Sequence, residues 1–296
     1  MLKKPKFKQS FLDHYKELTN LKEFIKYCEK PPRKSFRVNT LKTDIKKIKN
    51  RLKKYKLTQT PWCKQGFYLE GKTDLGNLIE HQLGYIYIQS STSMLPPEVL
   101  EIKENQLILD MAASPGSKTT QIAALAKNTG LIIANDISTK RLIPLATNLQ
   151  RNGVLNTIIS KQHGRFFKNL EADRVLLDAP CSGTGIIRKS PSTPTEWSVN
   201  LVKQLAGIQR QLIKVAFQNL KKNGILVYST CSLEPDENEK VIENLLETYK
   251  NAKLEKIDIK GSEPITDNKE IKNKCLRIWP QDYDTDGFFV AKIRKC

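Results

Sequence analysis

Two cysteines fifty positions apart lie in loops whose neighbouring residues suit catalysis. Cys181 belongs to the segment Asp-Ala-Pro-Cys-Ser-Gly-Thr-Gly, and Cys231 belongs to Ser-Thr-Cys-Ser-Leu-Glu-Pro. Each loop follows an apolar run typical of a β-strand, so each thiol is expected where the chain leaves a sheet. Ligands of parallel α/β sheets bind at that carboxyl edge. The pair therefore predicts covalent catalysis in which one thiol attacks and the other assists.

The alternative for either cysteine is a small buried apolar residue, the common fate of a free thiol. Two of them in polar loops at a sheet edge favour catalysis instead. The remaining cysteines have no comparable surroundings, and we expect them to be structural: Cys28, Cys63, Cys275 and Cys296.

Strands and helices alternate along the chain after about residue 95. The expected strands are residues 106–110, 130–136, 157–161, 174–178, 224–230, 276–279 and 287–293, and the expected helices are 117–127, 139–152, 199–220 and 235–249. Such alternation predicts a mostly parallel sheet covered by helices on both faces. The last two strands have no helix between them, so we expect an antiparallel pair at one edge. Pro144 is unfavourable inside its helix.

The first 95 residues read as a separate, basic α/β module. We expect an amphipathic stretch at 11–28, a strand at 35–40, a basic helix at 44–56 and β-like segments at 62–69 and 84–89. The predicted organisation is a basic module over 1–95 followed by a catalytic domain over 96–296.

Positive charge is concentrated at the start of the chain. The chain holds 50 Lys and Arg against 31 Asp and Glu, a formal charge of +19, and residues 1–60 alone hold 19 against 5. A charge gathered in one segment predicts contact with a nucleic-acid backbone. A lysine-rich solvated face is the alternative.

Nothing in the sequence predicts export, a membrane span or a metal site. The basic start is not followed by an apolar stretch, and no run approaches the roughly 18 apolar residues that a span requires. The six cysteines include no pair within four positions, so zinc-knuckle spacing is absent. We expect a cytoplasmic protein with reduced thiols and no bound metal.

A turn of small residues follows the first expected strand at Asp110 and leads into a helix that Ser117 is expected to cap. It matches neither the dinucleotide fingerprint nor the phosphate-binding loop. Asp136 ends the next strand, where a carboxylate can accept hydrogen bonds from ribose hydroxyls or merely cap a helix. The turn and the acidic residue together favour a nucleoside cofactor without a phosphate cradle, which points to S-adenosyl-L-methionine.

These segments resemble the successive motifs of the RNA (cytosine-carbon-5) methyltransferases of the RsmB/NSUN type. The similar segments are residues 37–41, 84–89, 110–120, 135–138, 178–191, 227–239, 277–280 and 286–291. The resemblance implies a Rossmann-like methyltransferase domain behind an RNA-binding module, with no role on DNA. The spelling of residues 114–121 is most similar to archaeal and eukaryotic tRNA-modifying members, so tRNA is expected as the partner before rRNA.

The resemblance also implies which side chains form the site. The implied cofactor contacts are Ala112, Ala113, Ser114, Pro115, Gly116, Ser117, Lys118, Asp136, Arg141 and Asp178. His163 stands where the family has an Asp. A neutral imidazole nitrogen can still accept a hydrogen bond from the adenine amino group, although an ordinary surface histidine is an equal alternative.

The implied reaction begins with Cys231. Its thiolate, favoured by the positive end of a helix expected from Pro235, adds to carbon 6 of cytosine and makes carbon 5 nucleophilic. The resemblance implies that Cys181 assists release of the product, that Asp178 bridges to the ring nitrogen and that Lys118 orients the cofactor or the base.

Three other classes of protein share parts of this pattern. In DNA cytosine methyltransferases the attacking thiol lies at the position of Cys181 and is followed by Gln, but Ser182 follows it here. Amino-group methyltransferases carry a different loop in place of Asp-Ala-Pro-Cys. A non-catalytic RNA-binding or assembly protein with this fold is the alternative from another class. The intact cysteines and acidic residues favour an enzyme.

Overall fold

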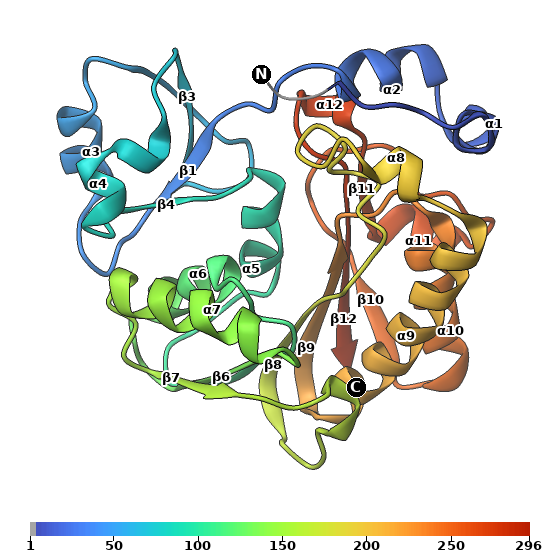
Figure 1. Cartoon of the computed structure of the whole chain (residues 1–296). Coiled ribbons are helices and arrows are strands. Elements are labelled where there is room, and N and C mark those ends of the chain that lie inside the picture. Colours follow the sequence, from blue (N-terminus) through green and yellow to red (C-terminus); the bar gives the residue numbers. More distant parts are fainter. Residues whose placement is uncertain (1–3) are drawn as a thin grey trace. The chain divides into compact units, whose positions relative to one another are not determined.

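The computed structural model describes residues 4–296, whose internal contacts form two compact units (Figure 1). The first unit contains the residues up to Pro32, then Ala179–Lys214 and Tyr228–Cys296. The second unit contains Arg33–Asp178 and Val215–Val227. The chain therefore leaves the first unit early and returns to it twice. The expected boundary at residue 95 remains a prediction.

An antiparallel sheet of four strands opens the second unit. Its strands are β1 (Ser35–Val38), β2 (Lys56–Gln59), β3 (Gly66–Glu70) and β4 (Ile86–Ile88), in the order β2-β3-β1-β4. The apolar side chains of Phe36, Phe67 and Ile86 are buried with Ile48 of α3 (Ile45–Arg51). Ile48 faces the sheet, whereas the lysines of α3 lie on the other faces of the helix. The basic side chains of α3 are therefore exposed.

The second unit also contains the parallel sheet that the alternation predicts. The strands β5 (Leu107–Asp110), β6 (Leu131–Asn135), β7 (Thr157–Ser160) and β8 (Ala172–Asp178) run parallel in the order β8-β5-β6-β7. The strand β9 (Leu220–Thr230) follows β8 in this order, with residues 220–227 in the unit. The helices are α4 (Ile79–Gln82), α5 (Leu95–Val99), α6 (Ser117–Leu125) and α7 (Thr139–Asn152).

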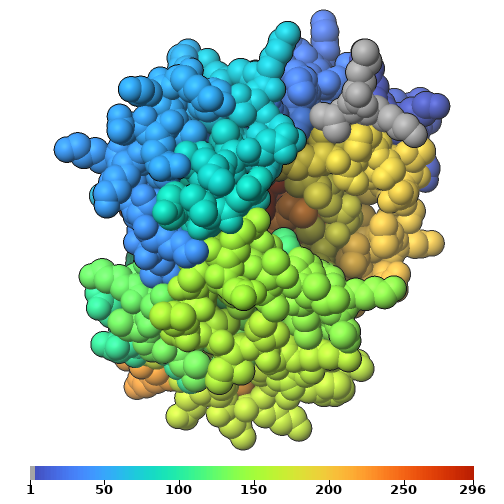
Figure 2. All heavy atoms as spheres, turned by 60° about the vertical axis from the view of Figure 1, so that its left-hand side comes forward, coloured from blue at the N-terminus to red at the C-terminus, as the bar shows by residue number. Residues whose placement is uncertain are grey.

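Hydrogen bonds join the antiparallel sheet to the helices of the parallel one. Arg37 of β1 is buried and donates to Gln89 and, over 2.9 Å, to Thr120 of α6. Asn39 donates to the carbonyl of Asn152 over 2.8 Å. In both views residues 33–90, coloured from blue to cyan, adjoin the green residues of α6 and α7 (Figure 2).

The first unit combines helices with an antiparallel edge. Its helices are α1 (Gln9–Leu18), α2 (Leu21–Cys28), α8 (Thr193–Glu196), most of α9 (Val199–Gln218), α10 (Glu239–Thr248), α11 (Lys269–Lys274) and α12 (Pro280–Tyr283). The strand β12 (Phe288–Lys295) pairs antiparallel with both β10 (Ala252–Glu255) and β11 (Leu276–Ile278). In its core, Tyr15 stacks on Phe24, and the rings of Phe11 and Phe24 pack edge to face with Trp197 and Trp279.

The α/β class, the Rossmann-like sheet and its antiparallel edge strands are confirmed. The helix expected at 139–152 is present as α7 in spite of Pro144. The helix expected at 44–56 is too long, because α3 ends at Arg51 and Lys56 already pairs with Glu70 in the sheet.

Two expectations about helix starts are wrong. Ser117 does not cap α6, since the N-cap is Gly116 at φ +99°, a left-handed conformation that favours glycine. The helix expected from Pro235 starts later. A 3₁₀ turn (Pro235–Glu237) ends at Asn238, whose ψ of −94° is not helical, and α10 begins at Glu239.

Candidate active site

The turn after β5 is held against two neighbouring strands. The main-chain N–H of Met111 donates to Leu176 of β8, and that of Ala113 donates to Asn135 of β6 over 2.7 Å. The predicted residues from Ala112 to Lys118 thus follow the carboxyl end of β5 directly. Their small side chains leave main-chain atoms accessible to a ligand.

Asp110 lies at the end of β5 and is almost completely buried. Its Oδ2 accepts a hydrogen bond from Thr119 over 2.7 Å, while Oδ1 receives none from the residues that the structure describes. Burial is the main cause that raises the pKa of this carboxyl to about 7.

Asp136 and Arg141 are brought to the same turn. Arg141 Nη2 donates to the carbonyl of Ser114 over 3.1 Å, and Ser114 Oγ donates to the carbonyl of Arg141. Arg141 Nε lies 3.3 Å from Asp136 Oδ2, but among described residues no hydrogen bond reaches that buried oxygen. Its partner Oδ1 accepts from the N–H of Ser138. One buried carboxylate oxygen therefore stays available to a ligand hydroxyl.

Lys118 and Asp178 form an ion pair within the second unit. Lys118 Nζ lies 2.7 Å from Asp178 Oδ2 and 3.0 Å from Ser93 Oγ. The lysine side chain is 10% exposed and the aspartate side chain 29% exposed, so the pair is partly shielded from water. This contact fixes the direction of the Asp178 carboxylate at the end of β8.

The contacts of His163 are local. Its Nδ1 accepts a hydrogen bond from the N–H of Arg165, and its ring centroid lies 5.8 Å from that of Phe166. The cofactor contact expected for His163 remains a prediction.

The two cysteines meet in the first unit. Their sulfurs are 3.3 Å apart, and both side chains are partly accessible. The hydrogen bond to Cys231 is the largest cause that raises the pKa of Cys181 well above its ordinary value, and burial adds to it. Sulfurs at this distance can share one proton, which suits two thiols that act in sequence.

Main-chain contacts hold the two cysteine loops together. The N–H of Gly185 donates to the carbonyl of Cys231 over 2.8 Å, and the carbonyl of Gly185 accepts from Gly287. A Cβ at position 185 would lie 2.3 Å from the Gly287 oxygen and 2.7 Å from the Cys231 oxygen. The close approach of the loops therefore requires glycine here.

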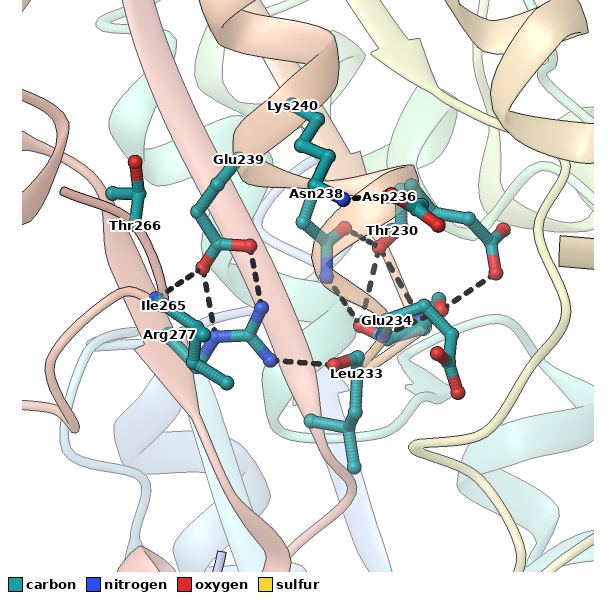
Figure 3. A network of polar contacts seen from close by, with 12 residues as sticks. Thr230, Leu233, Glu234, Asp236, Asn238, Glu239, Lys240, Ile265, Thr266 and Arg277 are labelled. Carbon is teal, nitrogen blue, oxygen red and sulfur yellow. Dashed lines mark hydrogen bonds and ion pairs between the residues drawn. The ribbon is translucent and has the colours of Figure 1, made fainter. Parts of the chain in front are cut away.

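The loop that carries Cys231 is closed by side chains (Figure 3). Thr230 Oγ1 donates to Asn238 Oδ1 over 2.6 Å, and Asn238 Nδ2 donates to the carbonyl of Ser232 over 2.9 Å. Arg277, buried with Glu239, donates to the carbonyl of Leu233 over 2.7 Å. Cys231 is consequently presented by a loop fixed on both sides.

Sequence reasoning missed Glu237 and Gln209, both fully buried. Glu237 accepts hydrogen bonds from Ser182 and Ser232, the residues that follow the two cysteines, and from Gln209 of α9. No spacing in the sequence links Glu237 to Ser182, so only the fold could reveal this group.

The residues of the second unit fit S-adenosyl-L-methionine. The available buried oxygen of Asp136 matches a ribose hydroxyl, and the turn from Ala112 to Gly116 offers main-chain groups to the rest of the molecule. Within residues 4–296, no cluster of His, Cys, Asp or Glu could hold a metal ion. Among these residues, no helix is both long and apolar enough to cross a membrane.

Two family models match the chain. Residues 97–294 match 16S rRNA methyltransferase RsmB/F, and residues 6–91 match the N-terminal domain of 16S rRNA methyltransferase RsmF.

Similar curated proteins include enzymes named for different RNAs. The chain is 45% identical over 98% of its length to tRNA (cytosine(49)-C(5))-methyltransferase of Pyrococcus abyssi, covering 97% of that protein. It is 42% identical over 97% of its length to Ribosomal RNA small subunit methyltransferase F of Shewanella frigidimarina, but spans 62% of that protein.

Two solved structures from Pyrococcus horikoshii have closely similar folds. The methyltransferase homolog protein aligns with a TM-score of 0.86 at 36% identity, covering 98% of this chain and 100% of that chain. NSun6 with SFG aligns with a TM-score of 0.88 at 28% identity, covering 98% of each chain.

Proposed function

The chain belongs to the RsmB/F family of RNA methyltransferases, and on that premise we propose that it forms 5-methylcytosine in tRNA through covalent attack by Cys231. The reaction class is that of an S-adenosyl-L-methionine-dependent RNA cytosine-carbon-5 methyltransferase. The observation that supports covalent catalysis by the two thiols is the 3.3 Å separation of the Cys181 and Cys231 sulfurs. A shared proton and a common approach to one base follow naturally from that distance.

Cys231 begins the reaction. Carbon 5 of cytosine is too electron-poor to take a methyl group unaided, so the Cys231 thiolate adds to carbon 6 and places the electron pair on carbon 5. When bound, S-adenosyl-L-methionine supplies the electrophilic methyl group that carbon 5 attacks. In the second unit, Asp136 holds the ribose, Asp178 bridges to the ring nitrogen that carries a proton in the adduct, and the ion pair with Lys118 orients the Asp178 carboxylate.

Cys181 completes the reaction. In its thiolate form it accepts the proton from carbon 5, the electron pair returns to the ring, and the bond between carbon 6 and Cys231 breaks. Because the pKa of Cys181 is raised, its thiolate is scarce at neutral pH and strongly basic when formed. Release should therefore accelerate as the pH rises. Both thiols must stay reduced, so we also propose a cytoplasmic location.

The proposed partner is tRNA, with residues 1–95 as its binding module. The exposed lysines of α3 and the spelling of residues 114–121 support this choice, as does the relative named for tRNA that the chain matches over nearly its full length. Ribosomal RNA is the second candidate, because other similar proteins are named for it. Purified enzyme is expected to methylate unmodified naked tRNA; methylation only of rRNA or ribosomal particles would reverse the order.

Single substitutions of the cysteines test the mechanism. Cys231→Ala removes the attacking thiol and should abolish both methylation and the covalent protein–RNA complex. Cys181→Ala permits attack and transfer but slows release, so the enzyme should accumulate on its methylated RNA.

The measurement is a denaturing gel of each variant with RNA and S-adenosyl-L-methionine, and the double variant is the control. Cys181→Ala is expected to give a slow-migrating band that the double variant lacks. A band from Cys231→Ala alone would reverse the two roles, and full activity of both single variants would disprove covalent catalysis.

A further inference from the structure

The buried carboxylate of Glu237 is connected to both cysteine loops. Ser182, which follows Cys181, donates to it twice, from its N–H over 3.0 Å and from its hydroxyl. Ser232, which follows Cys231, donates its hydroxyl to the same carboxylate over 2.9 Å. One side chain thus joins two loops that are fifty positions apart in the sequence.

Further bonds fix Glu237 itself. Gln209 of α9 donates to its carboxylate over 2.8 Å and to the carbonyl of Pro180, also over 2.8 Å. Tyr228 of β9 donates to the main-chain carbonyl of Glu237 over 2.5 Å. Each carboxylate oxygen then accepts two hydrogen bonds, which matches the capacity of an ionised carboxylate. A bridge whose acceptors are all occupied and fully buried holds its partners in one arrangement.

We propose that Glu237 is a positioning residue that keeps the Cys181 and Cys231 loops together, so that the two thiols act on the same base. The assignment of catalysis to these thiols rests on the proposed function, whereas their proximity does not. Glu237 does not touch the sulfurs in this arrangement and acts through Ser182 and Ser232. Its negative charge also contributes to the raised pKa of Cys181.

Two substitutions separate the bridge from the charge. Glu237→Ala removes all four accepted bonds. The two loops then keep the main-chain bond from Gly185 to Cys231 and the 3.0 Å contact between the Ser182 and Ser232 hydroxyls, which do not fix the side of the loops that carries Cys181, so the two sulfurs should move apart. Glu237→Gln can keep them, because its amide oxygen can face the N–H of Ser182 and Gln209 while its NH₂ group donates to hydroxyls that rotate. Glu237→Gln is therefore expected to preserve the distance between the thiols and to lower the pKa of Cys181.

A trivalent arsenical measures thiol proximity without RNA or cofactor. Phenylarsine oxide forms two S–As bonds with a close pair of thiols and releases one water molecule. An excess of a small monothiol then strips arsenic from single cysteines but not from a chelating pair. Intact-protein mass spectrometry after this chase should show the adduct in the wild type and in Glu237→Gln, and should not show it in Cys181→Ala or Glu237→Ala.

Glu234→Ala is the matched control. Glu234 is a buried residue three positions earlier whose carboxylate accepts from Tyr15 and Trp197. Its main-chain N–H donates to the Ser232 hydroxyl over 3.1 Å, and alanine keeps that N–H. Its variant should retain the adduct. If Glu237→Ala proves unfolded by circular dichroism, Ser232→Ala removes one arm of the bridge and is expected to reduce the adduct. The proposal would be overturned if Glu237→Ala is folded and its adduct is undiminished. If Glu237→Ala is unfolded, an undiminished adduct in Ser232→Ala would overturn it.

Kinetics link the geometry to the reaction. Loss of the bridge should lower kcat by up to about 10²-fold, the scale of a small misplacement of reacting groups, with the affinity for S-adenosyl-L-methionine unchanged. For Glu237→Gln, the rate of Cys181 alkylation against pH should have its midpoint at lower pH than the wild type; an unchanged midpoint would exclude the charge effect. The arsenical adducts could form as expected while the wild-type protein fails to methylate cytosine. That result would support the positioning role of Glu237 and refute the proposed function.

Discussion

Replacing Arg277 by Met should destabilise the first unit more than most single substitutions. Both Arg277 and Glu239 are fully buried, and the guanidinium donates to the two carboxylate oxygens over 2.9 and 2.6 Å. It also donates to the carbonyl of Leu233, as Figure 3 shows. The variant keeps the apolar stem of the side chain, but within residues 4–296 it leaves the buried carboxylate of Glu239 with one hydrogen bond, from the N–H of Ile265.

The expected loss is about 3–5 kcal/mol, the cost of removing one partner from a buried ion pair. Native domains are stable by only about 5–15 kcal/mol, so this single change approaches the margin. The double variant Arg277→Met/Glu239→Leu removes both charges and should recover at least about 2 kcal/mol of the loss. The main-chain groups of Leu233 and Ile265 then remain without these partners, so recovery should be incomplete.

Urea denaturation of the wild type, both single variants and the double variant at pH 7 measures this cycle. Lys240→Met is a control, because the lysine of its ion pair with Asp236 is exposed and the pair should contribute less than about 1 kcal/mol. Two results would refute the assignment of this stability to the buried pair. One is a loss of unfolding free energy below about 1 kcal/mol for Arg277→Met, and the other is a double variant whose loss equals the sum of the two single losses.

Three further outcomes are expected. Asp136→Ala should weaken binding of S-adenosyl-L-methionine by about 1–3 kcal/mol, because ribose hydroxyls lose a buried acceptor; calorimetry giving wild-type affinity would defeat the ribose assignment. Changing Lys46, Lys47 and Lys49 of α3 to Gln should reduce the salt dependence of RNA binding by about 0.7–0.9 in logarithmic slope for each phosphate that is no longer neutralised, and an unchanged slope would exclude α3 from the RNA path. Asp110 has a folded-state pKa of about 7, above its unfolded value of about 3.9. The wild type therefore loses stability as the pH rises from the unfolded value to the folded value, by up to about 4 kcal/mol. Asp110→Asn should therefore gain stability relative to the wild type as the pH rises from about 4 to about 7 in urea denaturation, with little further change above about pH 7. A difference that stays constant from about pH 4 to about pH 7 would show that the carboxyl does not titrate there.

The parallel sheet could be predicted because its signals are local. Apolar runs ending in Asp110, Asp136 and Asp178 coincide with strand ends to within one residue. The helix through Pro144 persists because packing of its apolar face, with Leu145 and Leu149 buried, outweighs the missing main-chain hydrogen bond. The helix expected from Pro235 begins later because Asn238 directs its side chain to Thr230. This contact takes the main chain of Asn238 out of the helical conformation.

The cysteine pair could be predicted from the sequence, but its supports could not. Cys181 and Cys231 each stand out by their loops, and the structure brings their sulfurs together. Glu237 and Gln209 have no such signal. In the sequence, Glu237 looks like any acidic residue near the start of a helix, and nothing marks it as buried. Their role depends on hydrogen bonds to Ser182 and Pro180, which the fold alone creates.

The three-segment construction of the first unit sets an order of events during synthesis. Phe11, Tyr15 and Phe24 leave the ribosome well before the indole rings that cover them, those of Trp197 and Trp279. Contacts between such distant positions form slowly because a long loop must close first. The nascent chain therefore carries an exposed aromatic surface until Trp279 has emerged. The second unit, which consists of residues 33–178 and 215–227, can assemble before that point.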